Sequence, residues 1–216
     1  MIRSRTLALC SGTFLFGVLV ATLMATLVSN RVAHATAQVA PPANPHPPFM
    51  CPGCSIEGNG GDAHWFEGKD FRKAYLVGMH ASNAVLDGSN FSGADLANWR
   101  AFSTSAKHTR FVGSFSDLAG FRFDDFTQAD FTGATLTNGF YQDSTFAGAN
   151  FTGANLSKTG IIKINFSGAN FTNANLSGVQ NLPPGGNIFT GAIWANTTCP
   201  DGTNSDAHGH TCIGHF

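Results

Sequence analysis

The sequence has few charged residues, and this scarcity excludes one large class of partners. Only 12% of the 216 residues are Asp, Glu, Lys or Arg, and the net charge is −1 at pH 7. Arg3, Arg5 and Arg31 lie in or beside the N-terminal segment, which leaves 9 of the 12 basic residues against 13 acidic ones elsewhere. No strongly basic surface is expected, so binding to nucleic acid is not expected either.

The chain also lacks the residue combinations that are typical of enzymes. No Ser/His/Asp combination, carboxylate pair or phosphate-binding loop stands out, and His64 and His80 stand alone and are interpreted as surface residues. We therefore expect no catalytic residue and no cofactor. The chain is instead rich in glycine (25) and phenylalanine (20), a combination that favours a stacked core with many tight corners over disorder.

Residues 1–37 are predicted to direct export. Two arginines precede a stretch without charge at residues 6–28, and two overlapping A-x-A patterns follow it. This order is typical of a secretory signal peptide, and cleavage after Ala37 or Ala35 is the preferred interpretation. The alternative is an uncleaved membrane anchor, because residues 6–28 approach the ~20 apolar residues that span a bilayer.

Both interpretations place the protein outside the cytoplasm: in the periplasm, at the cell surface or in the medium. The protein would meet a membrane only through residues 6–28, and only if they are retained. Residues 38–50 are rich in proline and are predicted to form a stiff, extended linker.

A five-residue period begins at Cys54 and continues to Pro183. Of the 23 Phe and Leu residues in this stretch, 17 fall on the third position of the five, where chance would place roughly a fifth of them. The period resumes three residues out of register at Asn187, so residues 183–186 are predicted to form a loop that bulges from one corner.

The spacing predicts how each unit folds. The first and third residues of a unit are two apart, so both point to the same side of an extended strand. Gly or Asn often occupies the fifth position, where a positive φ is easily adopted and the chain can turn. Short sides joined by corners close into a tube, which buries a small and a large residue from each unit and stacks on itself.

These units resemble the pentapeptide-repeat family, whose unit is written A-(D/N)-L-x-x. The sequences ANFTG at 149–153 and ANLSK at 154–158 are near-ideal copies, and CPGCSIEG at 51–58 is similar to a start often found in such proteins. The resemblance implies an all-β fold at residues 51–198: a right-handed quadrilateral β-helix of about 20 residues per coil. It also implies that residues 199–216 form a C-terminal tail that covers the open end.

A coil of twenty residues predicts that residues twenty apart stack on one side of the solenoid. We expect oppositely charged residues at this spacing to act as cross-strand pairs worth roughly 0.2–1 kcal/mol each. Three pairs qualify: Asp87 with Lys107, Arg110 with Asp130, and Asp143 with Lys163.

The repeat is least regular between residues 99 and 123. Ala101, Ala106 and Ser116 replace large inward residues, while aromatic and apolar residues stand at outward positions, and exposed aromatics beside arginines are typical of recognition surfaces. The alternative is that this coil bulges and buries its aromatic side chains. The candidate patch for a partner consists of Arg100, Phe102, Arg110, Phe115, Leu118, Arg122 and Phe123.

The cysteines near both ends of the solenoid are interpreted as structural disulfides. Cys199 and Cys212 would close the C-terminal tail, and Cys51 would pair with Cys54. Two alternatives remain open. Cys51 and Cys54 form a C-x-x-C pair that could exchange thiols, and a metal could bind the tail through His208, His210, Cys212 and His215.

The leading functional hypothesis is an exported, non-enzymatic interaction or scaffold module that binds an unknown protein or cell-envelope component; a homodimer is left open. The resemblance also implies a second class, because some family members inhibit DNA gyrase by mimicking DNA. Export and the near balance of 11 acidic and 9 basic residues in 54–183 argue against that class. Metal binding or thiol redox activity of the terminal Cys and His residues is a third class.

Overall fold

The protein is described by a computed structural model that covers residues 50–57, 66–183 and 185–216. The predicted signal or anchor segment and all but the last residue of the proline-rich linker lie outside the described residues, so their roles stay predictions. Within the described part, no helix is both long and apolar enough to cross a membrane.

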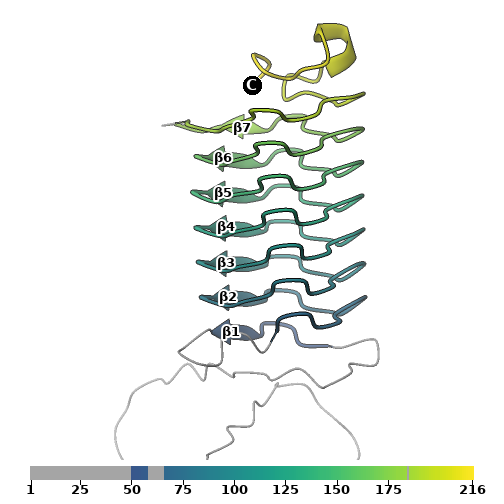
Figure 1. The fold of residues 1–216 in the computed structure, drawn as a ribbon. Helices are drawn as coiled ribbons and strands as arrows, with labels where there is room; N and C mark the ends of the chain where they lie inside the picture. The colour runs from purple at the N-terminus through teal and green to yellow at the C-terminus, as the bar shows by residue number, and fades with distance from the viewer. Residues whose placement is uncertain (1–49, 58–65, 184) are drawn as a thin grey trace, which may run out of the picture.

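Seven short strands stack in one parallel sheet along the length of a rod (Figure 1). Each strand pairs with the next in sequence, so the sheet order is the chain order. The strands are β1 (Ser55–Glu57), β2 (His80–Ser82), β3 (Arg100–Phe102), β4 (Gly120–Arg122), β5 (Phe140–Gln142), β6 (Gly160–Ile162) and β7 (Gln180–Asn181).

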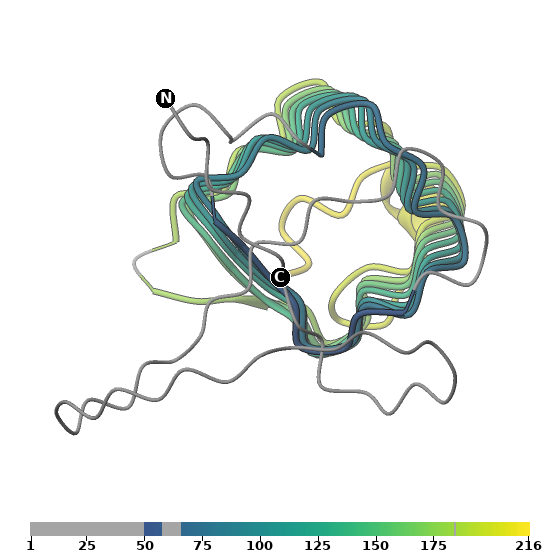
Figure 2. The ribbon, with the colours of Figure 1, turned by 90° about the horizontal axis from the view of Figure 1, so that it is seen from below.

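The register confirms the coil of twenty residues. Arg100 pairs with His80 on one side and with Gly120 on the other, each twenty residues away. The other sides of the rod keep the same spacing through isolated parallel bridges, such as Ser105 with Asp125. Twenty residues hold four units of five, and the coils superpose as a closed ring when viewed along the axis (Figure 2). The molecule is therefore a parallel β-solenoid with four units in each coil.

The first coil is longer than the repeat predicts. Ser55 pairs with His80, and Met50 pairs with Tyr75, so 25 residues separate these partners instead of twenty. The extra unit keeps the five-residue frame intact, and for this reason the sequence period could not reveal it. Uninterrupted coils of twenty residues from Cys54 onward were the wrong expectation for this coil.

Stacked rings fill the interior of the rod. Neighbouring rings in the longest column have centroids 4.7–5.3 Å apart and lie nearly parallel. Such ring pairs contribute about 0.5–1.5 kcal/mol each beyond the burial of their area. The column consists of Phe71, Phe91, Phe111, Phe131, Phe151, Phe171 and Trp194.

The loop predicted at residues 183–186 is confirmed. Beyond it, Asn165 pairs with Ile188 and Asn170 with Ile193, a spacing of 23 residues that accommodates three inserted residues. The loop projects from one corner of the ring when the rod is viewed along its axis (Figure 2). The inward positions of the next two units are still filled, since Phe189 is partly buried against the core and Trp194 is buried.

The predicted charge pairs stack on common sides, but only one forms an ion pair. Asp143 and Lys163 approach to 4.0 Å. The Lys107 ammonium instead lies 3.2 Å from Asp125, while Asp87 accepts the backbone N–H of Lys107. Arg110 and Asp130 are bridge partners in neighbouring coils, yet no ion pair joins them in the described structure. The assignment of Lys107 to Asp87 was therefore wrong at the level of side chains.

Candidate functional site

The seven residues of the candidate patch lie on three sides of the rod. Arg100 and Phe102 belong to β3, Arg122 belongs to β4, and Phe123 forms the corner after β4. Phe115 stands on the side that precedes the strands in each coil, in register with Asp95 and Thr135, and Leu118 forms its corner. Arg110 is one side further back, between Asn90 and Asp130. The structure thus gathers the four residues of β3, β4 and the following corner, and separates Arg110 from them.

The irregular coil does not bulge to bury its aromatic residues. It keeps the twenty-residue register on every side, and its apolar residues remain outside. The exposed fractions are 43% for Phe102, 46% for Phe115, 52% for Leu118 and 47% for Phe123.

Trp99 explains how this coil stays regular. It occupies the first, normally small, position of its unit and is fully buried, with its ring centroid 4.9 Å from that of Phe121 and 5.5 Å from that of Phe111. Its bulk fills space that the small side chains of Ala101 and Ala106 leave in the interior. The outward aromatics are not needed to fill the core, and they stay available on the surface.

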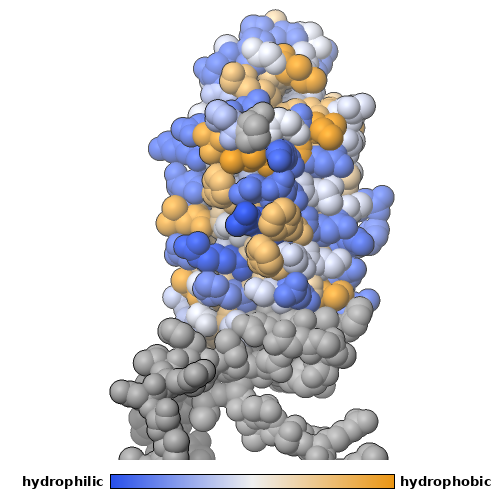
Figure 3. All heavy atoms as spheres, turned by 90° about the vertical axis from the view of Figure 1, so that its left-hand side faces the viewer, coloured by the Kyte–Doolittle hydropathy of each residue, from blue (hydrophilic) through white to orange (hydrophobic). Residues whose placement is uncertain are grey.

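We use the name β face for the outward side chains of β2–β7 and of the corner residue after each strand. Phe102 and Phe123 meet edge to face on it, with centroids 5.6 Å apart and planes at 89°. The guanidinium carbon of Arg122 lies 5.1 Å from the centroid of Phe123, within the range of a cation–π contact. Figure 3 views the rod from the side to which the strand arrows of Figure 1 point; hydrophobic and strongly hydrophilic side chains adjoin there.

The backbone of Phe123 is strained. Its φ is +61°, in the left-handed region that bulky residues rarely adopt. The equivalent corner residues Asn83 and Ser103 also have positive φ, but their side chains are small. A bulky residue in this region costs on the order of 1–3 kcal/mol, and such strain concentrates at functional sites.

A buried carboxylate holds the backbone next to this cluster. Asp124 is only 2% exposed, and its two carboxylate oxygens accept the backbone N–H groups of Thr104 and Arg122, each at 2.7 Å. Burial raises the pKa of Asp124 to about 7, although both hydrogen bonds act to lower it. Asp124 therefore ties the β3 and β4 coils together at the residue that follows Phe123 in the chain.

Phe140 is a further exposed aromatic of the β face that the candidate patch omitted. It is 44% exposed, and its ring lies over Gly160 of the next coil. A Cβ on Gly160 would lie 3.3 Å from Phe140 Cδ2 and 2.9 Å from Leu182 Cδ1, so the glycine leaves room for both apolar side chains. The sequence signal was an aromatic residue at an outward position followed, twenty residues later, by glycine.

The charges of the β face are unbalanced. Within the described residues, neither Arg100 nor Arg122 forms an ion pair. The face carries one carboxylate, that of Asp143, which pairs with Lys163. The two arginines are therefore free to meet a group from another molecule.

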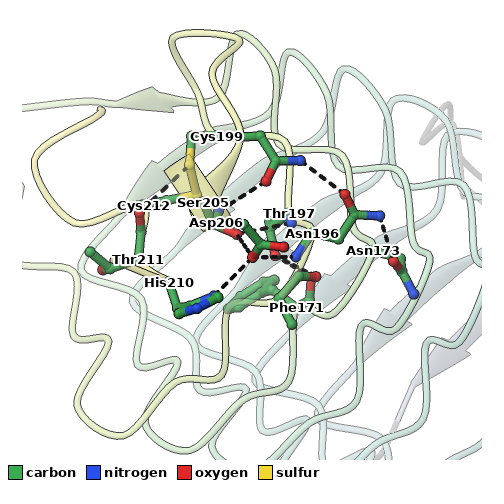
Figure 4. A network of polar contacts seen from close by, with 12 residues as sticks. Phe171, Asn173, Asn196, Thr197, Cys199, Ser205, Asp206, His210, Thr211 and Cys212 are labelled. Atoms are coloured by element: carbon green, nitrogen blue, oxygen red, sulfur yellow. Dashed lines mark hydrogen bonds and ion pairs between the residues drawn. A yellow bond between two sulfur atoms is a disulfide. The ribbon is translucent and has the colours of Figure 1, made fainter. Parts of the chain in front are cut away.

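The C-terminal tail is held by a disulfide and a polar network (Figure 4). Cys199 and Cys212 are bonded, with Cα atoms 5.2 Å apart. Asp206, in the 3₁₀ helix η2 (Ser205–His208), accepts the backbone N–H of Asn196 at 2.9 Å and contacts the ring of His210 at 3.0 Å. These contacts fix the tail to the last coil.

The tail places the four alternative metal ligands in other contacts. Cys212 is bonded to Cys199, His210 contacts Asp206, and His215 contacts Asp201 at 2.7 Å, while the ring of His208 lies 4.1 Å from that of His215. No three His, Cys, Asp or Glu side chains come together as a metal site in the part of the chain that the structure describes. At the other end, Cys51 is bonded to Cys54, with Cα atoms 5.5 Å apart.

A family model for pentapeptide repeats matches residues 70–98, 125–159 and 161–180, with eight copies of the unit. The chain belongs to the pentapeptide-repeat family. The stretch of 99–124 that the family model leaves unmatched includes β3, β4, Phe123 and Asp124. The pentapeptide-repeat fold continues through this stretch. Only the side chains depart from the family pattern there.

Solved structures of pentapeptide-repeat proteins are similar to this chain at low identity. QnrB1, a plasmid-mediated fluoroquinolone resistance protein, is 19% identical over 68% of this chain and 73% of its own, with a TM-score of 0.38. HetL, involved in heterocyst differentiation regulation in the cyanobacterium Nostoc, is 19% identical over 72% of this chain and 87% of its own, with a TM-score of 0.27. A pentapeptide-repeat protein from the thylakoid lumen of Arabidopsis thaliana is 17% identical over 72% and 83%, with a TM-score of 0.19. No curated protein matches the chain.

Proposed function

We propose that this pentapeptide-repeat protein is an exported, non-enzymatic interaction module whose β face binds a partner protein of the cell envelope. The observation that carries the proposal is the cluster of Phe102, Arg122 and Phe123. Two half-exposed rings and a guanidinium contact one another on a rigid sheet, and one ring is held at a strained backbone position. Aromatic and arginine side chains dominate the energetics of protein interfaces.

Export is supported by two features of the chain. Residues 1–37 have the order of a secretory signal peptide or anchor. Both cysteine pairs outside that segment are bonded, which suits an oxidising compartment. Mimicry of DNA is not proposed, because a DNA mimic needs a row of carboxylates, whereas the β face carries unpaired arginines.

The proposal is tested by recovering partners from envelope extracts with the full chain as bait. The test variant is Phe102→Ser/Phe123→Asn, which copies Ser82 and Asn83 from the equivalent positions of the β2 coil and should leave the fold intact. The matched control is Tyr75→Asn/Ile193→Asn, which removes exposed apolar side chains from other sides. We expect the wild type and the control to recover the same partner and the test variant to lose it. Equal recovery by all three proteins would refute the proposal.

A further inference from the structure

We infer that the partner of the β face presents an acidic amphipathic segment, with carboxylates that meet Arg100 and Arg122 and apolar side chains that pack on Phe102, Phe123 and Phe140. This inference rests on the proposed function and specifies the chemistry of the partner.

Charge complementarity selects an acidic occupant. Arg100 and Arg122 lie on neighbouring strands without an ion pair in the described structure, and the carboxylate of Asp143 is already next to Lys163. A guanidinium presents its donors as a planar fork that matches a carboxylate in two parallel hydrogen bonds. Arg122 is also oriented by the Phe123 ring, so less side-chain entropy is lost when it binds.

The orientation of the rings favours a polypeptide over a polysaccharide. The planes of Phe102 and Phe123 stand at 89° to each other, so the two rings do not form a flat platform for sugar rings. The side chain of phenylalanine also has no hydroxyl or N–H group that could form a hydrogen bond with a sugar. An edge-to-face pair with a third ring at Phe140 instead presents an uneven apolar surface, which suits Leu-like side chains.

Two other occupants fit less well. Residues 1–49 contain Arg3, Arg5 and Arg31 but no Asp or Glu, so this segment has no carboxylates for the arginines of the β face. A second copy docked face to face would bring the same two unpaired arginines and only one carboxylate, that of Asp143, which is already next to Lys163. A separate acidic partner therefore remains the occupant that the charges favour.

The size of the contact sets the expected affinity. β3 and β5 are two coils apart, so the three phenylalanines span about 10 Å along the rod, which is about two turns of a helix. Such a contact is at the low end of specific interfaces, for which we expect a Kd on the order of micromolar or weaker.

The test uses the full chain and synthetic peptides of about 18 residues with Leu on one helical face and Glu on the other. One control peptide has Lys in place of Glu, and a second has Ser in place of Leu. Binding is measured by fluorescence anisotropy at low and high salt. We expect the Glu–Leu peptide to bind at least about tenfold more tightly than either control, and its binding to weaken as salt rises.

Charge reversal on the protein provides the decisive comparison. Arg100→Glu/Arg122→Glu should lose the Glu–Leu peptide and prefer the Lys–Leu peptide. Lys73→Glu/Arg110→Glu makes the same change of net charge on another side and should bind like the wild type. Phe102→Ser/Phe123→Asn should weaken binding without reversing the charge preference. An effect of net charge alone would make the two reversal variants behave alike, and that result would overturn the inference.

Other results would also overturn the inference, and they distinguish its failure from a failure of the proposed function. If envelope partners are captured through the β face but the Glu–Leu peptide does not bind, the inference fails while the proposed function stands. Binding of polygalacturonate without binding of the peptide would assign the face to a polysaccharide. Self-association lost in Phe102→Ser/Phe123→Asn, measured by sedimentation, would assign the face to a second copy.

Discussion

Gly139 lies beneath the ring of Tyr141, so close that a Cβ on Gly139 would be 2.7 Å from Tyr141 Oη and 2.8 Å from Tyr141 Cζ. The units that contain the strands repeatedly combine one large and one small inward residue. The pairs are Met79 with Ala81, Trp99 with Ala101, Ala119 with Phe121, and Gly139 with Tyr141. Each of these coils thus has one large inward side chain on this side of the rod. It stands at the first position of the unit in two coils and at the third position in the other two.

This relationship predicts the effect of a single methyl group. Gly139→Ala should destabilise the protein by about 1–3 kcal/mol, because Tyr141 is fully buried and cannot move aside without disturbing its neighbours. Gly139→Ala/Tyr141→Leu should recover most of the loss, since Leu is common at the large position. Urea unfolding of the three proteins measures the difference; equal stability of Gly139→Ala and wild type would contradict the packing.

Leu118 offers a gain in stability. It forms a corner with φ of +59°, where the neighbouring coils have Asn98 and Asn138, and its side chain is 52% exposed. Leu118→Asn should stabilise the protein by about 1 kcal/mol, because Asn tolerates the left-handed region better. Leu118→Ala keeps the strain and serves as the control. A melting temperature that rises equally in both variants would show that backbone strain is not the cause.

Asp124 should make stability depend on pH. Its pKa is raised in the folded protein to about 7 from 3.8, so its favourable contribution is complete below pH 3.8 and is lost as pH rises through 7. The loss is a few kcal/mol at most, at about 1.4 kcal/mol per pKa unit. Urea unfolding between pH 5 and 8 should show it.

The control for Asp124 is Asp124→Ser, which copies Ser144 from the equivalent position of the next coil, where the serine hydroxyl accepts the N–H of Asp124. Wild type should lose stability relative to Asp124→Ser as pH rises from 5 to 8. The comparison isolates position 124, because the two proteins are otherwise identical. A difference that stays constant over this range would contradict a carboxylate that titrates near neutrality.

Removal of the Cys199–Cys212 disulfide should loosen the tail. The bond closes a loop of about 14 residues, for which a stabilisation of about 3 kcal/mol is expected. Cys199→Ser/Cys212→Ser should be cut by protease within residues 199–216, while the coils stay resistant. Unchanged protease resistance of the tail would mean that its hydrogen bonds alone hold it in place.

The five-residue period predicted the fold because it fixes which residues point inward, and the inward residues form the core. It could not count coils where five residues are inserted, as between Ser55 and His80, because such an insertion leaves the period unchanged. The three-residue insertion before Asn187 was found because it breaks the period. Lys107 forms its ion pair with Asp125 and not with Asp87. A long side chain can reach several nearby carboxylates, and the register alone does not say which one it contacts.

The candidate site was only partly predictable for a related reason. Outward aromatics could be recognised in the sequence, but grouping them requires the side of the rod on which each one lies. Arg110 and Phe102 are eight residues apart yet stand on different sides, whereas Phe102 and Phe123 are in adjacent coils and touch. Phe140 belongs to the same surface but lies outside the irregular stretch at residues 99–123, so the irregularity of the repeat did not predict it.

The most direct test of the β face as an interaction surface is site-specific photo-crosslinking in intact cells. A photoreactive amino acid at position 102 is compared with one at position 193, where Ile193 is 53% exposed on another side. We predict a discrete adduct with an envelope protein from position 102 and none from position 193. Adducts of the same kind from both positions, or from position 193 alone, would contradict the β face as the interaction surface.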